Sequence, residues 1–106
     1  HPAHITDERY QRVFREQCSG GGSTFSFTLE GGRDVVFPIL NRLRLFKLAV
    51  SLGGSESLVC HPASTTHSGV DRQVRDKLEI SDSLVRISIG LEHPDDLIAD
   101  LTQALA

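Results

Sequence analysis

The segment LVRISIG, from Leu84 to Gly90, constrains the fold of this chain more than any other. Apolar residues alternate with polar ones along it, a pattern typical of a β-strand that has one buried face. Its β-branched residues point to that face, because successive side chains on a strand project to opposite sides. Arg86 and Ser88 point to the other face. The chain must therefore form a sheet that packs on a core through one side and carries a lone arginine on the other.

The remaining periodicity predicts four helices and three further extended segments. The predicted helices cover residues 6–17 with Thr6 as cap, 34–45 with Pro38 in the first turn, 71–78, and 94–105 with Leu97, Ile98, Leu101 and Leu105 inward. The further extended segments are TFSFTLE at 24–30, the apolar run 46–51 and residues 62–66, with a helical turn at 55–58. Short connections favour a small antiparallel sheet of about four strands with helices on one face, an α+β fold.

A second constraint is the stretch LAVSLGGSESLVCHPASTTH, residues 48–67, whose apolar run stops at Ser51-Leu52-Gly53-Gly54. A hydroxyl at a glycine-rich strand end and an arginine on a strand suggest one shared task, which is to bind a carboxylate. The planar guanidinium can make two parallel charged hydrogen bonds, and glycine lets a ligand approach bare backbone. Two plainer alternatives stay open. Arg86 could pair with an acid on the exposed face, and the glycines could simply form a turn.

Composition excludes several classes of function. The 106 residues predict a single domain over 1–106 with a modest core. A net charge of −3 without a basic patch argues against a nucleic-acid partner. No apolar run approaches the roughly 20 residues that span a bilayer, so no membrane partner is expected. Cys18 and Cys60 are expected to be free thiols. The histidines lack partners at ligand spacing, so no metal site is expected, and His93 is assigned to the start of the last helix.

No residue of this chain is predicted to be catalytic. Cys60 and His61 are adjacent in sequence, which is not the spatial arrangement that a Cys/His dyad requires. The two lysines, Lys47 and Lys77, lie on an apolar strand and a polar helix without an activating context. The chain also contains no methionine, and we expect it to be part of a longer protein.

Two long motifs match a known family. The stretch LAVSLGGSESLVCHPASTTH, followed by ISDSLVRISIGLEHPDDLIADLTQAL, resembles the C-terminal end of the Cys/Met-metabolism enzymes that use pyridoxal phosphate. These enzymes include cystathionine γ-synthase, cystathionine γ-lyase, methionine γ-lyase and the homoserine-ester sulfhydrylases. HPAH and the following helix, then SGGGSTFSFTLEGG, resemble the segment that leads into that domain. The likeness covers nearly the whole chain.

The resemblance implies the small C-terminal domain of a fold type I enzyme, with the large cofactor-binding domain outside this chain. It implies that the cofactor lysine, the phosphate-binding loop and the stacking tyrosine belong to the large domain, and neither Lys47 nor Lys77 matches the lysine motif. The family arginine that binds the substrate α-carboxylate falls on Arg86, and the serine that helps to place it falls on Ser51, with Val50, Leu52 and Gly53 nearby. The full-length enzyme is expected to be a cytoplasmic homotetramer acting on a small amino-acid substrate. The fragment alone is expected to bind no cofactor and to be inactive.

The resemblance leaves the reaction open. Val50 stands where cystathionine γ-lyases usually carry an acid, which favours a methionine γ-lyase or a sulfhydrylase. The LGGSES pattern instead is nearer to the synthases and lyases than to the LGDA form of many methionine γ-lyases. The predicted chemistry is γ- or β-elimination or replacement on a sulfur amino acid or a homoserine ester. The rival from another class is a free-standing α+β domain that binds a small carboxylate or mediates assembly.

Overall fold

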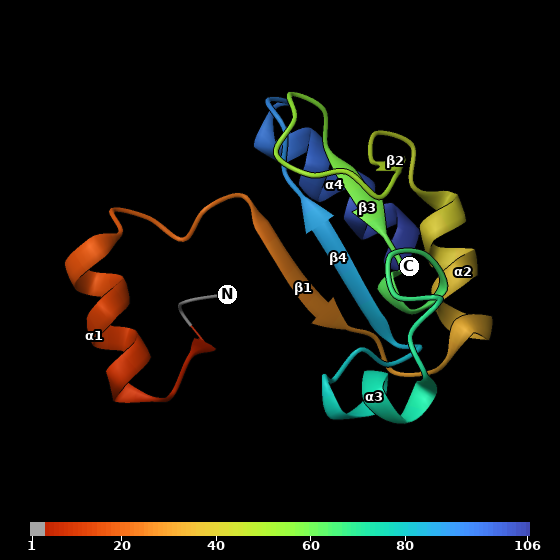
Figure 1. The fold of residues 1–106 in the computed structure, drawn as a ribbon. Coiled ribbons are helices and arrows are strands. Elements are labelled where there is room, and N and C mark those ends of the chain that lie inside the picture. Colours follow the sequence, from red (N-terminus) through yellow and green to blue (C-terminus); the bar gives the residue numbers. More distant parts are fainter. Residues whose placement is uncertain (1–3) are drawn as a thin grey trace.

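The computed structural model describes residues 4–106 and is built around a four-stranded sheet in the order β1–β4–β3–β2 (Figure 1). The strands are β1 (Thr24–Thr28), β2 (Lys47–Leu48), β3 (Leu58–Cys60) and β4 (Leu84–Ser88). β4 is antiparallel to both β1 and β3, whereas β2 is parallel to β3. The sheet is therefore mixed and not purely antiparallel as predicted. The reason is that the chain loops back after β2 before it enters β3, instead of turning as a hairpin.

Two helices, α2 (Arg33–Arg42) and α4 (Pro94–Leu105), cover one face of this sheet, as predicted (Figure 1). The apolar side chains of both helices meet those of the central strands. The buried cluster consists of Val36, Leu40, Phe46, Val59, Val85, Ile87 and Leu97. Val85 and Ile87 are completely buried, so the alternation in LVRISIG placed the core face of β4 correctly. Phe25 and Phe27 of β1 are half-buried against the same cluster.

The segment between β2 and α3 (Arg72–Lys77) differs most from its prediction. The predicted strand at 46–51 keeps only two residues in β2, and the predicted helical turn at 55–58 is absent because bends lead directly into β3. Residues 62–66, predicted as extended, instead contain a short 3₁₀ helix, η2 (Pro62–Ser64). β3 is buried on both faces, so its sequence lacks the alternation that identifies a half-buried strand.

The helix boundaries also shift by a few residues. α2 begins at Arg33 and ends at Arg42, so Pro38 lies inside the helix and not in its first turn. In α4, Leu97 is buried and Leu101 half-buried as predicted, but Ile98 and Leu105 are exposed. Asp100 and Ala104 occupy the buried positions instead, and Asp100 is held there because its carboxylate accepts hydrogen bonds from the backbone N–H groups of residues 44–46.

The first helix, α1 (Glu8–Gln17), lies away from the sheet and buries none of its residues (Figure 1). Asp7 and not Thr6 caps it, because the Asp7 carboxylate accepts a hydrogen bond of 2.9 Å from the Arg9 N–H. The short helix α3 (Arg72–Lys77) is capped by Asp71 in the same way. His93 caps α4 by accepting from the Asp95 N–H, which confirms its predicted place at the helix start.

Candidate functional site

The middle of β4 carries the arginine that the sequence singled out. The register pairs Arg86 with Ser26 on β1 and with Cys60 on β3, so the guanidinium rises from the centre of the sheet on the face opposite α2 and α4. Arg86 is only half-buried. It makes no ion pair within residues 4–106, which argues against a simple pair with an acid on the sheet.

The structure brings Arg86 to the glycine-rich stretch that lies 35 residues earlier in the chain. Its Nη2 donates hydrogen bonds to the carbonyl oxygen of Val50 at 2.7 Å and to that of Ser51 at 3.2 Å. The two segments that the sequence proposed for one site are therefore in direct contact. The contact is made through backbone carbonyls, and the exposed Ser51 side chain remains available to a ligand.

Leu52 and Gly53 complete the exposed turn beside Arg86. Gly53 has a φ of +76°, in the left-handed region that favours glycine. Its N–H donates at 2.8 Å to the hydroxyl of Ser88, two residues beyond Arg86 on the same face of β4. Ser88 is nearly fully buried, so this hydroxyl serves the turn and is not open to a ligand. The LVRISIG alternation already placed Ser88 on this face but gave no sign of its partner.

A second group of polar residues holds the far end of the same loop. Ser57 is completely buried, and its N–H and hydroxyl both donate to the carboxylate of Glu92 at 2.8 Å. The hydrogen bond from the Ser57 N–H is the largest cause that lowers the pKa of Glu92, with the Glu92 N–H and the Ser57 hydroxyl adding to it. Neither residue was assigned a role from the sequence, although both lie within the two long motifs, because no local pattern shows that residues 35 positions apart are partners.

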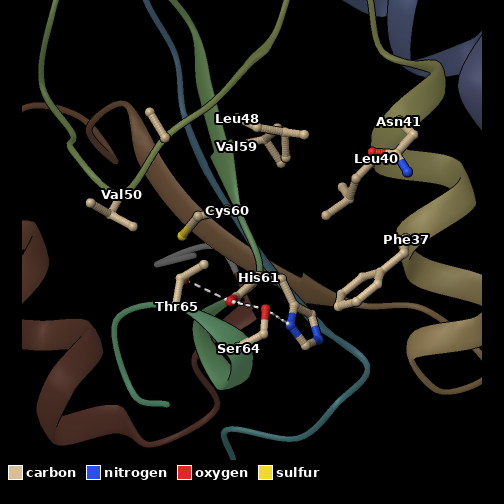
Figure 2. Close-up of a pocket in the computed structure, with 11 residues that line it drawn as sticks. Phe37, Leu40, Asn41, Leu48, Val50, Val59, Cys60, His61, Ser64 and Thr65 are labelled. Carbon is tan, nitrogen blue, oxygen red and sulfur yellow. Dashed lines mark hydrogen bonds between the residues drawn. The ribbon is translucent and has the colours of Figure 1, made fainter. Parts of the chain in front are cut away.

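A mainly apolar cavity of about 320 Å³ adjoins this site (Figure 2). It opens between α2, the end of β2 and the segment after β3. Val50, whose carbonyl binds Arg86, and Cys60, which pairs with Arg86 across the sheet, both border it. The full lining is Phe37, Leu40, Asn41, Leu48, Ala49, Val50, Val59, Cys60, His61, Ser64 and Thr65.

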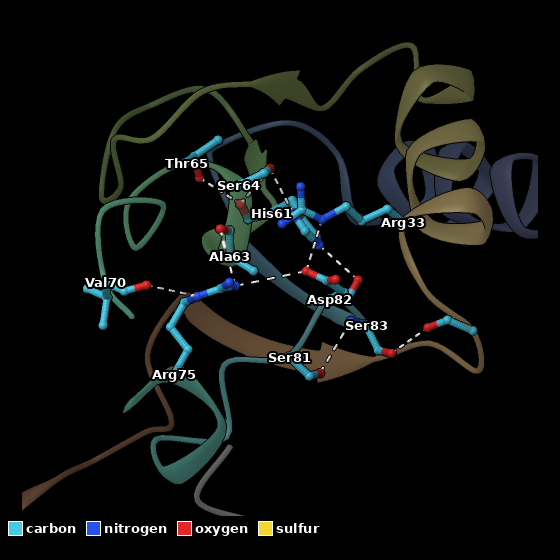
Figure 3. A network of polar contacts seen from close by, with 11 residues as sticks. Arg33, His61, Ala63, Ser64, Thr65, Val70, Arg75, Ser81, Asp82 and Ser83 are labelled. Atoms are coloured by element: carbon cyan, nitrogen blue, oxygen red, sulfur yellow. Dashed lines mark hydrogen bonds and ion pairs between the residues drawn. The ribbon is translucent and has the colours of Figure 1, made fainter. Parts of the chain in front are cut away.

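His61 at the bottom of this cavity is a structural residue. It is 3% exposed, and both ring nitrogens are paired, Nδ1 with the Ser64 hydroxyl and Nε2 with the Asp82 carbonyl, each at 2.8 Å. Figure 3 shows Arg33 and Arg75 converging on the carboxylate of Asp82. The Arg33 hydrogen bond is the main cause that lowers the pKa of Asp82. The His61 bond ties η2 to Asp82, just before β4, and the two ion pairs tie α2 and the helix at 72–77 to the same residue.

Groups for metal binding or covalent chemistry do not assemble in the part of the chain that the structure describes. Among residues 4–106, no three His, Cys, Asp or Glu side chains lie together as metal ligands, and His1 lies outside this range. Cys60 is a free, buried thiol and Cys18 a free, exposed one. Lys47 and Lys77 are both exposed. No described helix is long and apolar enough to cross a membrane.

Comparison with known proteins gives one consistent family. A family model described as "Cys/Met metabolism PLP-dependent enzyme" matches residues 1–106. The L-methionine gamma-lyase of Fusobacterium nucleatum subsp. polymorphum is 44% identical over 99% of this chain and 25% of its own length. The cystathionine gamma-lyase of Saccharomyces cerevisiae is 41% identical over 99% of this chain and 27% of its own length.

A solved structure has the same fold. The cystathionine gamma synthase from Xanthomonas oryzae pv. oryzae, in complex with cystathionine, superposes with a TM-score of 0.87 at 43% identity. The match covers 98% of this chain and 27% of that one. The chain thus spans about a quarter of the length of the proteins that it matches.

Proposed function

This chain belongs to the family of Cys/Met-metabolism PLP-dependent enzymes, and from that premise we propose that it is the C-terminal, substrate-carboxylate-binding domain of such an enzyme. The family depends on pyridoxal phosphate. The large domain that binds the cofactor would lie in the remaining three quarters of the family length. The full enzyme would carry out γ- or β-elimination or replacement on a sulfur amino acid or a homoserine ester.

The observation that carries this proposal is the contact between Arg86 and the turn at Ser51. A guanidinium has five N–H donors, and Arg86 uses only those of Nη2 within the described residues. The N–H groups of Nε and Nη1 can donate to a carboxylate. The two carbonyls hold the guanidinium plane in one orientation, and because each parallel pair of N–H donors on a guanidinium includes Nη2, a bidentate carboxylate would take over one of these two carbonyl contacts. Ser51 would add a hydroxyl beside the same carboxylate.

The division of labour follows from this geometry. Pyridoxal phosphate, when bound, supplies the electron sink for the reaction. This chain would hold the substrate by its carboxylate and so orient the bond at Cα that must break. Because neither Lys47 nor Lys77 matches the lysine motif of the family, the cofactor lysine would come from the large domain, and the isolated chain would be inactive. We also propose a cytoplasmic homotetramer as the full enzyme.

The side chain of Val50 bears on which reaction occurs. It is exposed and apolar, and it stands at the edge of the cavity beside Arg86. An apolar residue there would suit a substrate with an uncharged distal end, such as methionine, better than cystathionine. The relatives include lyases for both substrates, so comparison of the two substrates in the full-length enzyme is the direct test.

Replacement of Arg86 tests the proposal. In the full-length enzyme, Arg86→Ala should raise KM for the amino-acid substrate by about 10- to 150-fold, because hydrogen bonds to a charged group contribute about 1.5–3 kcal/mol. Arg86→Lys should recover little of this loss, because an ammonium cannot reproduce the planar fork. The matched control is Arg72→Ala on α3, which removes an exposed arginine remote from Ser51 and should leave KM unchanged. An unchanged KM in Arg86→Ala would refute the assignment.

A further inference from the structure

The loop from Val50 to Ser57 is attached to β4 and its continuation at successive points. Arg86 binds the carbonyls at its start, the Ser88 hydroxyl accepts from the Gly53 N–H, and the Leu91 N–H donates to the Ser55 carbonyl at 2.8 Å. The contacts fall in order at Arg86, Ser88 and Leu91, so the loop runs alongside β4 and the residues that follow it. The position of the Ser51 turn over the sheet is therefore set by the whole row of contacts and not by Arg86 alone.

The last contact in this row is made by a carboxylate. The carboxylate of Glu92 accepts two hydrogen bonds of 2.8 Å from Ser57, and the Ser57 hydroxyl in turn accepts from the Gly90 N–H at 2.9 Å. Hydrogen bonds to an ionised carboxylate are roughly twice as strong as neutral ones. Since the pKa of Glu92 is lowered by these same bonds, the side chain is ionised at neutral pH. Glu92 therefore fixes the end of the loop at the point where β3 begins.

The backbone around this contact is closely packed. A Cβ at Gly90 would overlap the Ser55 carbonyl oxygen and the Glu56 carbonyl carbon. The loop thus rests directly on the backbone after β4, and any loosening at Ser57 lets it lift away. Such a movement would carry the Val50 and Ser51 carbonyls with it, and these are the groups that orient the Arg86 guanidinium.

We propose that Glu92 is a positioning residue for the substrate carboxylate, acting through Ser57 on the loop that orients Arg86 and Ser51. The proposal rests on the proposed function of Arg86. It assigns Glu92 no contact with the substrate. A misplacement of about 1 Å at a binding group can cost up to 100-fold in rate or affinity, so a partial loosening of the loop is expected to cost about tenfold.

The test uses the full-length enzyme with bound cofactor and two small probes. L-alanine and ethylamine differ only by the carboxylate, and their dissociation constants can be read from the absorbance of the bound pyridoxal phosphate. Glu92→Ala should raise the dissociation constant of L-alanine about tenfold and leave that of ethylamine within about twofold. Glu92→Gln keeps one oxygen for the Ser57 N–H and should recover about half of the loss on a logarithmic scale, so that L-alanine binds about threefold more weakly than to the parent. The matched control, Asp96→Ala, removes an exposed carboxylate nearby on α4 and should change neither constant.

A double variant separates positioning from general destabilisation. Because Glu92 acts through Arg86 and Ser51, Glu92→Ala added to Arg86→Ala should weaken L-alanine binding by less than about threefold, since only Ser51 then remains to be misplaced and coupled residues are not additive. A full tenfold further loss, or an equal loss of ethylamine binding, would overturn the inference. If Glu92→Ala does not fold, Glu92→Gln carries the test, and L-alanine binding equal to that of the parent would then overturn it. Arg86→Ala with unchanged L-alanine binding would instead refute the proposed function itself.

Discussion

Asp100 is the buried carboxylate on which the entry into β2 depends, and its removal has a predictable cost. It is 5% exposed and accepts from three consecutive backbone N–H groups, those of Arg44, Leu45 and Phe46, at 2.8–3.2 Å. The Gln103 side chain donates a further hydrogen bond at 3.0 Å. Residues 44–46 join the end of α2 to the start of β2, and neither the helix nor the strand provides acceptors for their N–H groups. Asp100 supplies the missing acceptor from α4.

The cost of Asp100→Ala follows from these contacts. The Phe46 N–H would be left buried without a partner, at about 1–3 kcal/mol, while those of Arg44 and Leu45 lie nearer the surface and can take water in part. We therefore expect the free energy of unfolding to fall by about 3 kcal/mol. For a chain of this length, that loss lowers Tm by at least about 12 °C.

Urea unfolding of the 106-residue chain, followed by circular dichroism, measures this loss. Asp96→Ala is the control, because Asp96 is an exposed carboxylate in the first turn of the same helix and should cost less than about 1 kcal/mol. Asp100→Asn keeps one acceptor oxygen and should fall between the two. If Asp100→Ala lost less than about 1 kcal/mol, the view that this carboxylate satisfies buried N–H groups would be wrong.

Two further predictions concern pH and packing. Burial alone would raise the pKa of Asp100, but the hydrogen bonds from Arg44, Leu45, Gln103 and Phe46 together outweigh it and lower the pKa. The stability that Asp100 contributes is therefore complete above the unfolded-state pKa of about 4 and is lost as the pH falls through the lower pKa of the folded state. In Asp100→Asn, the free energy of unfolding in urea should therefore fall less steeply between pH 6 and 3 than in the parent. Gly90→Ala should displace the loop at Ser55 and weaken L-alanine binding to the full-length enzyme. The control is Gly69→Ala, whose added Cβ meets no atom within 4 Å and should leave L-alanine binding unchanged. If the two variants bound L-alanine equally well, the close packing described at Gly90 would be contradicted.

Several features of the fold were predictable because their signals are local. The alternation in LVRISIG and TFSFTLE depends only on neighbouring residues, and it placed Val85 and Ile87 in the core and Arg86 on the opposite face correctly. The proximity of Arg86 and Ser51 was a hypothesis from residue types, and the structure brings the two segments into contact. Whether they bind a carboxylate stays a prediction.

Other features needed partners that are distant in the sequence. β3 was missed and β2 was overextended, because a two-residue strand and a doubly buried strand have no periodicity of their own. Ile98 was expected to face inward and is exposed, whereas Asp100 is buried. Hydropathy predicts the reverse for both, and only the three N–H groups of residues 44–46 make a buried carboxylate favourable.

The sequence by itself thus determined which segments are helices or half-buried strands, and it identified the family through two long motifs, because both kinds of information lie in contiguous residues. The tertiary structure alone decided that β2 runs parallel to β3 and that Ser57 and Glu92 hold the Ser51 turn. Those outcomes depend on hydrogen bonds between residues that are far apart in the chain. A donor or acceptor has the same chemistry wherever it stands in the sequence, and only folding selects its partner.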